Sequence, residues 1–267
     1  MTIQVDPDWW KTLFDDIYLM TDARSVCDDD LTRKEVDLFC ELIPMTPKDK
    51  ILDLCGGHGR HSLELCRRGF NGCTVVDYSQ NLIDKGCQTS EICGLPVTFI
   101  RGDARELDLD DAFFHHVMIL GNSLGYIPDA DADAHILKES FRVLGQGGWL
   151  LLDVADGNAI RDNFSPSAWH EIGHDILVCR QREMREDYIC ARELVIRKSG
   201  GLIRDRTYGM RIYEAKGIMD LIRKCGFDKI RCLTDFSPMN LQGDLGFMNH
   251  RMLVTAQKPR AQYAKNV

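Results

Sequence analysis

Short apolar runs alternate with amphipathic stretches between Lys50 and Asp153. The runs are rich in aliphatic and β-branched residues, which is typical of strands that are buried on both faces. They are Ile51–Leu54, Cys73–Val76, Val97–Ile100, Val117–Leu120 and Trp149–Leu152. Three of the intervening stretches have helical spacing of apolar residues: Arg60–Arg68, Gln80–Cys87 and Ala132–Leu144. This alternation predicts an α/β fold, with a doubly wound, mostly parallel sheet and helices on both of its faces.

The pattern changes between Trp169 and Tyr213. Three segments alternate apolar and polar residues one by one and are separated by turn-forming residues: Ile176–Arg182, Tyr188–Lys198 and Leu202–Tyr213. Such alternation predicts an antiparallel β insertion with one face exposed to water. A helix at Ala215–Cys225 and strands at Lys229–Leu233 and Met252–Ala256 are then expected to complete the main sheet.

The N-terminal segment is expected to be helical from Trp9 to Ile43, and Leu31–Ile43 has the clearer amphipathic pattern. We therefore predict three units in the chain. They are an N-terminal helical cap (1–44), a core (45–168 and 214–267) and an antiparallel β insertion (169–213).

Composition narrows the classes of protein that this sequence fits. The chain has 267 residues, with 33 Lys and Arg against 41 Asp and Glu and a formal net charge of −8. An acidic chain without a basic block argues against nucleic acid or an anionic membrane surface as a partner. No apolar run reaches the roughly 18 residues of a membrane-spanning helix, so no membrane-spanning helix is expected.

The cysteines indicate the compartment. None of the eleven forms a Cys-x-x-Cys pair, and the first ten residues lack the basic and then apolar start of a secretory signal. These features predict reduced thiols and a cytoplasmic location. No cluster of His, Cys and carboxylate residues has the spacing of metal ligands, so no metal is expected.

A glycine-rich turn follows the first predicted strand, in the run Asp53-Leu-Cys-Gly-Gly-His-Gly-Arg-His-Ser62. Glycines allow a sharp turn and a close approach by a ligand, and the next helix presents unpaired N–H groups to an anion. Asp77 ends the second strand, where a carboxylate can accept hydrogen bonds from both ribose hydroxyls. Asp103 ends the third strand and can accept a hydrogen bond from the amino group of adenine. The pattern predicts a ligand that contains adenosine.

Asp53 and Ser62 bear on which adenosine ligand fits. The pyrophosphate of a dinucleotide such as NAD would be repelled by Asp53, whereas the ammonium of an amino acid would be attracted to it. Ser62 also occupies the third glycine position of dinucleotide-binding sequences. The residues therefore favour S-adenosylmethionine over NAD.

Four motifs carry a family resemblance: the Leu52–Ser62 turn, Asp77, the triplet Gly102-Asp103-Ala104 and the strand in Gly147–Asp153. With them, residues 45–155 resemble the class I S-adenosylmethionine-dependent methyltransferases that act on small molecules. The resemblance implies a Rossmann-like sheet of seven strands whose last strand is antiparallel. It also implies S-adenosylmethionine as the cofactor, lying over the carboxyl ends of the early strands, and S-adenosylhomocysteine as its product.

The resemblance further implies which residues contact the cofactor. Asp53 and the turn glycines would surround its methionine part, Asp77 its ribose and Asp103 its adenine. The loop after the fourth strand would lie near the sulfonium, and in similar enzymes the N-terminal segment folds over the cofactor. The implied set is Tyr18, Asp53, Cys55, Gly56, Gly57, Gly59, Asp77, Tyr78, Gly102, Asp103, Ala104, Leu120, Gly121 and Asn122.

The methyl acceptor is less visible in the sequence. In-line SN2 displacement from an activated sulfonium needs alignment more than it needs a strong base. The catalytic candidates are polar residues expected near the strand ends: Tyr126, His174 and His250. The Trp9-Trp10 pair is expected to pack on the core. The resemblance implies that the β insertion is a lid on the acceptor side, and a stabilising flap or the surface of a homodimer is the alternative.

We expect a cytoplasmic enzyme that transfers a methyl group to an oxygen or nitrogen of a small-molecule acceptor. The alternatives are methylation of carbon or of a macromolecule such as tRNA or protein, an NAD-dependent oxidoreductase, and a noncatalytic protein that binds S-adenosylmethionine. Methylation of nucleic acid is disfavoured by the segment that follows the fourth strand, Leu120-Gly-Asn-Ser-Leu-Gly125. It lacks the Pro-Pro-aromatic sequence that stacks an extruded base.

Overall fold

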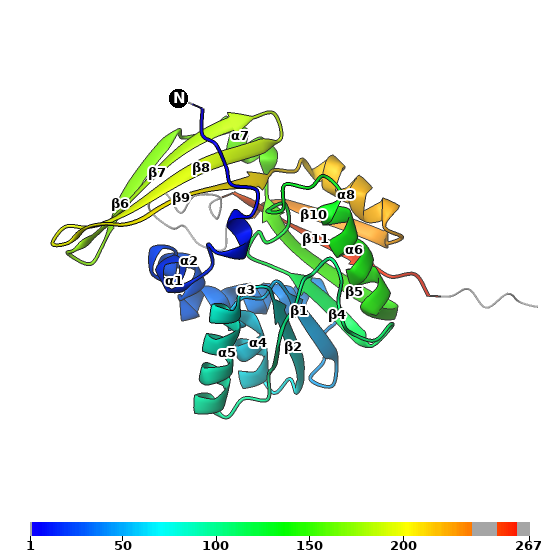
Figure 1. Ribbon diagram of the computed structural model, residues 1–267. Coiled ribbons are helices and arrows are strands. Elements are labelled where there is room, and N and C mark those ends of the chain that lie inside the picture. The colour runs from blue at the N-terminus through cyan, green and yellow to red at the C-terminus, as the bar shows by residue number, and fades with distance from the viewer. Residues whose placement is uncertain (1, 237–249, 261–267) are drawn as a thin grey trace, which may run out of the picture.

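A computed structural model describes residues 2–236 and 250–260 of the chain. Its centre is a seven-stranded sheet with the order β10-β11-β5-β4-β1-β2-β3 (Figure 1). The strands are β1 (Lys50–Leu54), β2 (Gly72–Asp77), β3 (Thr98–Arg101), β4 (Phe114–Ile119), β5 (Leu144–Ala155), β10 (Asp228–Phe236) and β11 (Arg251–Gln257). Strands β1 to β5 pair in parallel, and β11 is antiparallel to both of its neighbours, β5 and β10. The predicted mostly parallel sheet with an antiparallel last strand is confirmed.

Apolar side chains cover both faces of this sheet, because successive residues of a strand point to opposite sides. The helices after the N-terminal region are α3 (Asp29–Leu42), α4 (Arg60–Arg67), α5 (Gln80–Cys93), α6 (Ala132–Val143), α7 (Gly157–Asp162) and α8 (Ala215–Lys224). Leu52 and Leu150 pack on one face with residues of α6 and α8, and Ile51 and Leu151 pack on the other with residues of α3 and α4. The near-continuous burial of β1, β4, β5 and β11 explains why their apolar runs were readable in the sequence, whereas the edge strand β3 has no buried position.

The β insertion is a separate antiparallel sheet with the order β6-β7-β8-β9. Its strands are β6 (Ser167–Ile172), β7 (Ile176–Arg185), β8 (Tyr188–Arg197) and β9 (Gly201–Arg211). The sequence predicted three of these strands and missed β6. This edge strand alternates between exposed and half-buried residues and has no buried position, so no apolar run marks it.

The predicted N-terminal helical segment is divided into four pieces. They are a 3-10 turn η1 (Trp9–Lys11), α1 (Asp16–Thr21), α2 (Ala23–Val26) and α3. Asp15 begins α1 by accepting hydrogen bonds from the N–H groups of Ile17 and Tyr18, and Asp28 begins α3 by accepting one from Leu31. In Figure 1, α1 and α2 lie below the four-stranded sheet, and Ile17 and Met20 of α1 pack against apolar residues of β7 and β8.

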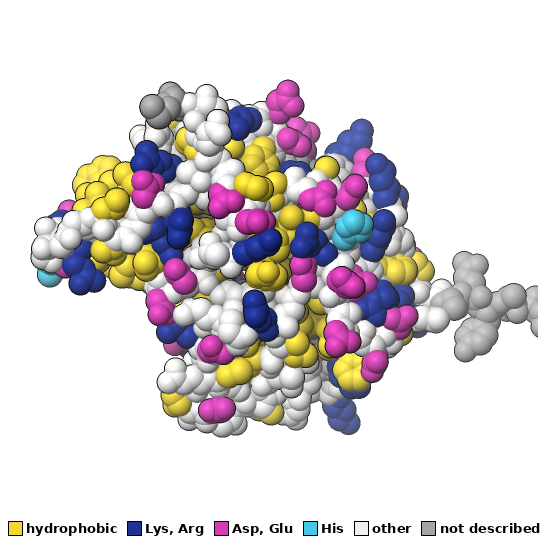
Figure 2. Space-filling model, viewed as in Figure 1, with side chains coloured by type: hydrophobic (Ala, Val, Ile, Leu, Met, Phe, Trp, Pro, Cys, Tyr) yellow, Lys and Arg dark blue, Asp and Glu magenta, His cyan; other side chains and the backbone are white. Residues whose placement is uncertain are grey.

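Charged side chains of both signs are interspersed on the face of the molecule in Figure 2. All eleven cysteines are free thiols. In the part of the chain that the structure describes, no helix is both long and apolar enough to cross a bilayer.

Candidate functional site

Two cavities adjoin where the parallel strands of the main sheet have their carboxyl ends. The first is lined by loops that follow β1, β2, β3 and β4 and by the N-terminal segment. The second lies between the N-terminal segment, the loop after β4 and the four-stranded sheet. Four residues line both cavities: Phe14, Tyr18, Gly121 and Tyr126. The carboxyl edge of an open α/β sheet is the usual place for a ligand in such folds.

The glycine turn after β1 is tightly packed. A Cβ on Gly56 would come within 2.6 Å of Cγ of Asp53, and a Cβ on Gly59 would come within 2.7 Å of the Phe99 ring. Gly57 has a positive φ of 59°, and so does the non-glycine residue Cys55. Strained backbone of this kind is often retained at a functional site.

Asp77 joins the end of β2 to this turn. Its carboxylate accepts hydrogen bonds from the N–H groups of Gly57 and Ser79, each at 2.8 Å. Burial raises the pKa of Asp77, although these two N–H groups and that of Tyr78 oppose the shift. Because the residue also lines the first cavity, the same carboxylate shapes the turn and faces the ligand space.

Asp103 and the aromatic rings form the outer part of the first cavity. Arg105 donates to Asp103 at 2.6 Å and holds the pKa of that carboxyl below its usual value. Trp10 meets Tyr78 edge to face, with the ring centroids 4.7 Å apart, and the Arg105 guanidinium lies 5.3 Å from the Trp10 ring. Trp9 is buried, as expected for a residue that packs on the core, and it also lines the second cavity, whereas Trp10 lines the first.

Asp53 does not face the first cavity. It is fully buried beneath the glycine turn, where the hydroxyl of Ser62 donates to Oδ2 at 2.9 Å. Among the described residues, Oδ1 has no hydrogen-bond partner. Burial raises the pKa of Asp53 to about 6. Because Gly56 packs against it, Asp53 supports the turn from below, and its contact with the ligand stays a prediction.

Asp53→Asn should change how stability depends on pH. The folded protein with a pKa of about 6 at Asp53 takes up a proton between pH 6 and 3.8, where the unfolded chain does not. This uptake stabilises the native protein as pH falls, so its stability relative to Asp53→Asn should rise by about 2.4 kcal/mol from pH 7 to pH 4. Urea unfolding of the cofactor-free proteins at both pH values measures this difference. The exposed Asp84→Asn variant is the control, and a constant difference for Asp53→Asn would contradict the assignment.

Most residues of the implied cofactor set line the first cavity: Tyr18, Cys55, Gly57, Asp77, Tyr78, Gly102, Asp103, Ala104 and Gly121. Besides Asp53, four of the set do not. Gly56 and Gly59 pack against Asp53 and Phe99 within the turn, and Leu120 is buried in the core cluster beside α3 and α4. Asn122 lines the second cavity instead.

The three catalytic candidates are placed differently from one another. Tyr126 lies between the two cavities, with its ring centroid 5.3 Å from that of Trp9 and 5.6 Å from that of Phe14. Burial raises its pKa, so the phenol stays protonated and is not a base at neutral pH. His174 and His250 line neither cavity. His174 lies in the exposed turn between β6 and β7, and the backbone carbonyl of His250 accepts from the N–H of Asp156 just before β11.

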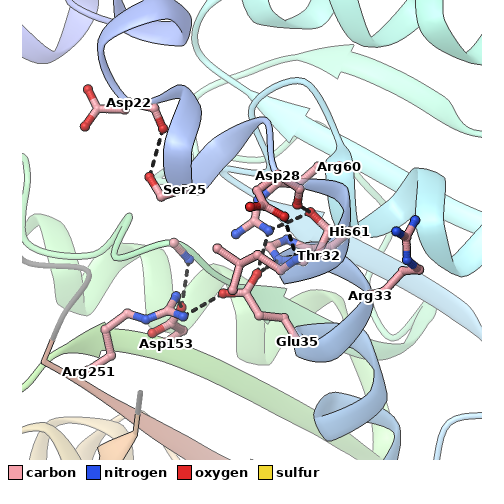
Figure 3. Close-up of polar contacts among 12 residues, drawn as sticks. Asp22, Ser25, Asp28, Thr32, Arg33, Glu35, Arg60, His61, Asp153 and Arg251 are labelled. Carbon is pink, nitrogen blue, oxygen red and sulfur yellow. Dashed lines mark hydrogen bonds and ion pairs between the residues drawn. The ribbon is translucent and has the colours of Figure 1, made fainter. Parts of the chain in front are cut away.

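A buried ionic network lies beside the two cavities (Figure 3). Glu35 of α3 accepts from Arg60 at 2.5 Å, from Arg251 at 2.6 Å and interacts with His61 at 2.9 Å. Arg251 also donates to Asp153 at 2.5 Å, and Asp153 accepts from the N–H of Gly121 at 3.1 Å. The network thus connects the N-terminal cap, the helix after the glycine turn and the loop that lines both cavities.

The charges of this network compensate one another. Burial by itself would raise the pKa of Glu35, but Arg60, His61 and Arg251 together hold it well below its usual value. Burial and the nearby Arg60 lower the pKa of His61 to about 4, so its imidazole is neutral at pH 7. Two carboxylates are therefore matched by two guanidinium groups. No sequence motif predicted this network, because its members come from four distant segments of the chain.

No metal site accompanies these cavities in residues 2–236 and 250–260, where no group of three or more His, Cys, Asp or Glu side chains is arranged to hold an ion.

Sequence comparison finds proteins that are similar to this chain. Residues 51–148 match the family described as "Methyltransferase domain". The chain is 26% identical over 242 residues to YqeM of Bacillus subtilis, which is named as a candidate methyltransferase, and the match covers 88% of this chain and 96% of that protein.

Solved structures show the same fold. The CcbJ methyltransferase of Streptomyces caelestis is similar with a TM-score of 0.76 at 15% identity, over 95% of this chain and 99% of that one. CalS10 of Micromonospora echinaspora, an amino pentose methyltransferase solved with bound S-adenosylmethionine, gives a TM-score of 0.62 at 16% identity, over 86% and 90% of the two chains.

Proposed function

We propose that this chain, which has the fold of class I S-adenosylmethionine-dependent methyltransferases and matches a methyltransferase domain over residues 51–148, methylates an oxygen or nitrogen atom of a small-molecule acceptor held in the second cavity. The observation that carries this proposal is the shared wall of the two cavities. Phe14, Tyr18, Gly121 and Tyr126 line both, so a donor in the first cavity and an acceptor in the second would meet at these residues.

The first cavity has the chemistry that S-adenosylmethionine requires. Asp77 and Asp103 offer carboxylates for the ribose and the adenine amino group, and Trp10 and Tyr78 offer aromatic surface beside them. The positive φ of Gly57 brings the backbone close to the cavity without a side chain. When bound, the cofactor supplies a methyl group activated by its sulfonium charge.

The residues around the second cavity mainly bind, align and exclude water. Aromatic rings of Trp9, Phe14 and Tyr126 pack together at its boundary with the first cavity. Burial keeps the phenols of Tyr126 and Tyr208 protonated, so each can donate a hydrogen bond to the acceptor. In-line displacement then depends chiefly on the alignment of a neutral or deprotonated acceptor atom. CalS10, which is named an amino pentose methyltransferase, supports a small molecule as the acceptor class.

Transfer of a deuterated methyl group tests this proposal. The purified protein is incubated with methyl-deuterated S-adenosylmethionine and a bacterial metabolite extract, with total tRNA, or with denatured protein, and each product is analysed by mass spectrometry. We expect the label on an oxygen or nitrogen of a compound in the metabolite extract. Label found on carbon, or in the tRNA or protein fraction instead, would contradict the proposed acceptor class.

Asp77→Ala should weaken the binding of S-adenosylhomocysteine by about 1–3 kcal/mol, because charge-assisted hydrogen bonds are lost. The variant loses the carboxylate that faces the ligand and the acceptor that positions Gly57. Isothermal titration measures the change. Asp84→Ala removes a nearby exposed acid of α5 and should bind the ligand like the native protein. Unchanged affinity in Asp77→Ala would remove Asp77 from the proposed site.

A further inference from the structure

The two faces of the β insertion have different surroundings. On the inner face, Val178 of β7 and Val195 of β8 are fully buried and pack with Ile17 of α1. Successive residues of a strand point to opposite faces, so the neighbours of these valines in sequence form the outer face. One end of the outer face is apolar, and we call it the outer patch. It consists of Trp169, Leu177, Cys179, Leu194, Ile196 and Leu202.

The strand register makes the outer patch continuous. Trp169 lies opposite Cys179 and Cys179 lies opposite Leu194, so these three side chains form one row on the same face. The other three members form the next row, across β7, β8 and β9. Trp169 is 69% exposed and Leu202 is 59% exposed, while the other members are half-buried. Figure 2 shows hydrophobic side chains gathered on the projecting end of this sheet, at the left of the view.

The start of the chain packs near the other end of the outer face. The N–H of Ile3, which is buried, donates to Glu183 of β7 at 2.8 Å, and Arg185 donates to the carbonyl of Ile3 at 2.6 Å. Glu183 lies four residues along β7 from Cys179, which is about 13 Å in a strand. The N-terminal segment therefore leaves the outer patch exposed. An exposed apolar patch that spans several strands is typical of a surface for protein interaction.

The charges beside the outer patch balance one another. Glu171 of β6 pairs with Lys198 at 3.0 Å, and Asp205 of β9 pairs with Arg192 at 2.6 Å. A nucleic acid or an anionic membrane would require an excess of basic residues here. Two identical faces can meet without repulsion when each is locally neutral, even though the whole chain has a net charge of −8. The charge balance therefore favours a second copy of this chain over a charged partner.

We propose that two copies of this chain form a homodimer through their outer patches. A twofold axis would place each patch against the same patch of the other copy, as in most homodimers. Trp169 would be the main anchor, because exposed apolar area of more than about 100 Å² on one tryptophan would be buried. The inner face of the same strands lines the second cavity with Arg180 and Glu193. The insertion would thus serve both as a wall of the acceptor site and as the contact between subunits.

Sedimentation velocity of the full chain over a range of concentrations tests the proposal. We expect a dimer, and Trp169→Asp should raise its dissociation constant at least about thirtyfold, as for a residue that dominates an interface. The control is Ile92→Asp, because Ile92 is 77% exposed on α5, outside the insertion. A monomer at every concentration overturns the proposal. A dimer that is equally stable in the two variants overturns it as well.

A second variant and a labelling experiment give independent readouts. Leu202→Asp should also weaken the dimer, and it replaces Trp169→Asp as the test if circular dichroism shows that the latter does not fold. In the native protein, Cys179 should lose most of its labelling by N-ethylmaleimide when the protein is concentrated into the dimer. Cys93, which is exposed on α5, should be labelled equally at both concentrations. A constant ratio of Cys179 to Cys93 labelling would place the outer patch outside the interface and overturn the proposal.

Discussion

Arg251→Met is expected to lower the free energy of unfolding by about 3–5 kcal/mol, because removal of one partner leaves buried charges uncompensated. Arg251 is 1% exposed and donates to Glu35 and Asp153, which are themselves 0% and 1% exposed. Methionine fills much of the same volume, so the loss reports the charge and the hydrogen bonds rather than a cavity. After the substitution Glu35 keeps Arg60, whereas Asp153 loses its guanidinium partner.

Equilibrium unfolding in urea at pH 7 measures this effect. Arg192→Met is the matched control, since it removes an arginine that is 46% exposed and pairs with Asp205 on the surface. Exposed pairs of this kind contribute about 0–1 kcal/mol. If Arg251→Met and Arg192→Met were equally stable, the network would not be an important part of the fold. Arg251→Met is also expected to weaken cofactor binding, because its partner Asp153 accepts a hydrogen bond from the N–H of Gly121.

The main sheet was predictable because most of its parallel strands are buried on both faces. Strands β1, β2, β4 and β5 contain buried aliphatic residues, and burial on both sides leaves little room for polar residues between them, whereas the edge strand β3 has no buried position. Strand β6 lacked an apolar run because it lies at an edge of the insertion, with exposed residues at alternate positions. The breaks in the N-terminal segment at Asp15 and Asp28 depend on capping hydrogen bonds that its apolar spacing does not encode.

The candidate site was predictable in position but only partly in orientation. Parallel strands bring their carboxyl ends to one edge, so the residues after β1, β2 and β3 had to gather there. Whether an acid at that edge faces the cavity depends on local packing: Asp77 lines it, whereas Asp53 lies under Gly56. Contacts between distant segments were not predictable from spacing. Glu35 and Arg251 are 216 positions apart, and Arg204 meets Asp15 across 189.

Gly121→Leu is expected to reduce kcat/KM for methyl transfer by about a hundredfold to a thousandfold, as misplacement of reacting atoms by about 1 Å costs roughly a hundredfold. Gly121 lines both cavities, and a Cβ on it would meet no atom within 4 Å. A leucine side chain therefore has room to enter the space between donor and acceptor. Gly121→Ala, which adds one carbon atom, should lose less activity than Gly121→Leu.

The backbone strain of this substitution needs its own control, because Gly121 has a positive φ of 66°. Gly94 has a φ of 63°, a Cβ on it would also meet no atom within 4 Å, and it is exposed at the end of α5. Leucine in a left-handed conformation costs about 1–2 kcal/mol at either position. Gly94→Leu should therefore match Gly121→Leu in loss of stability while keeping its activity in the deuterated-methyl assay. Equal activity of the two variants would show that the boundary between the cavities is not the path of methyl transfer, since strain alone would then account for both.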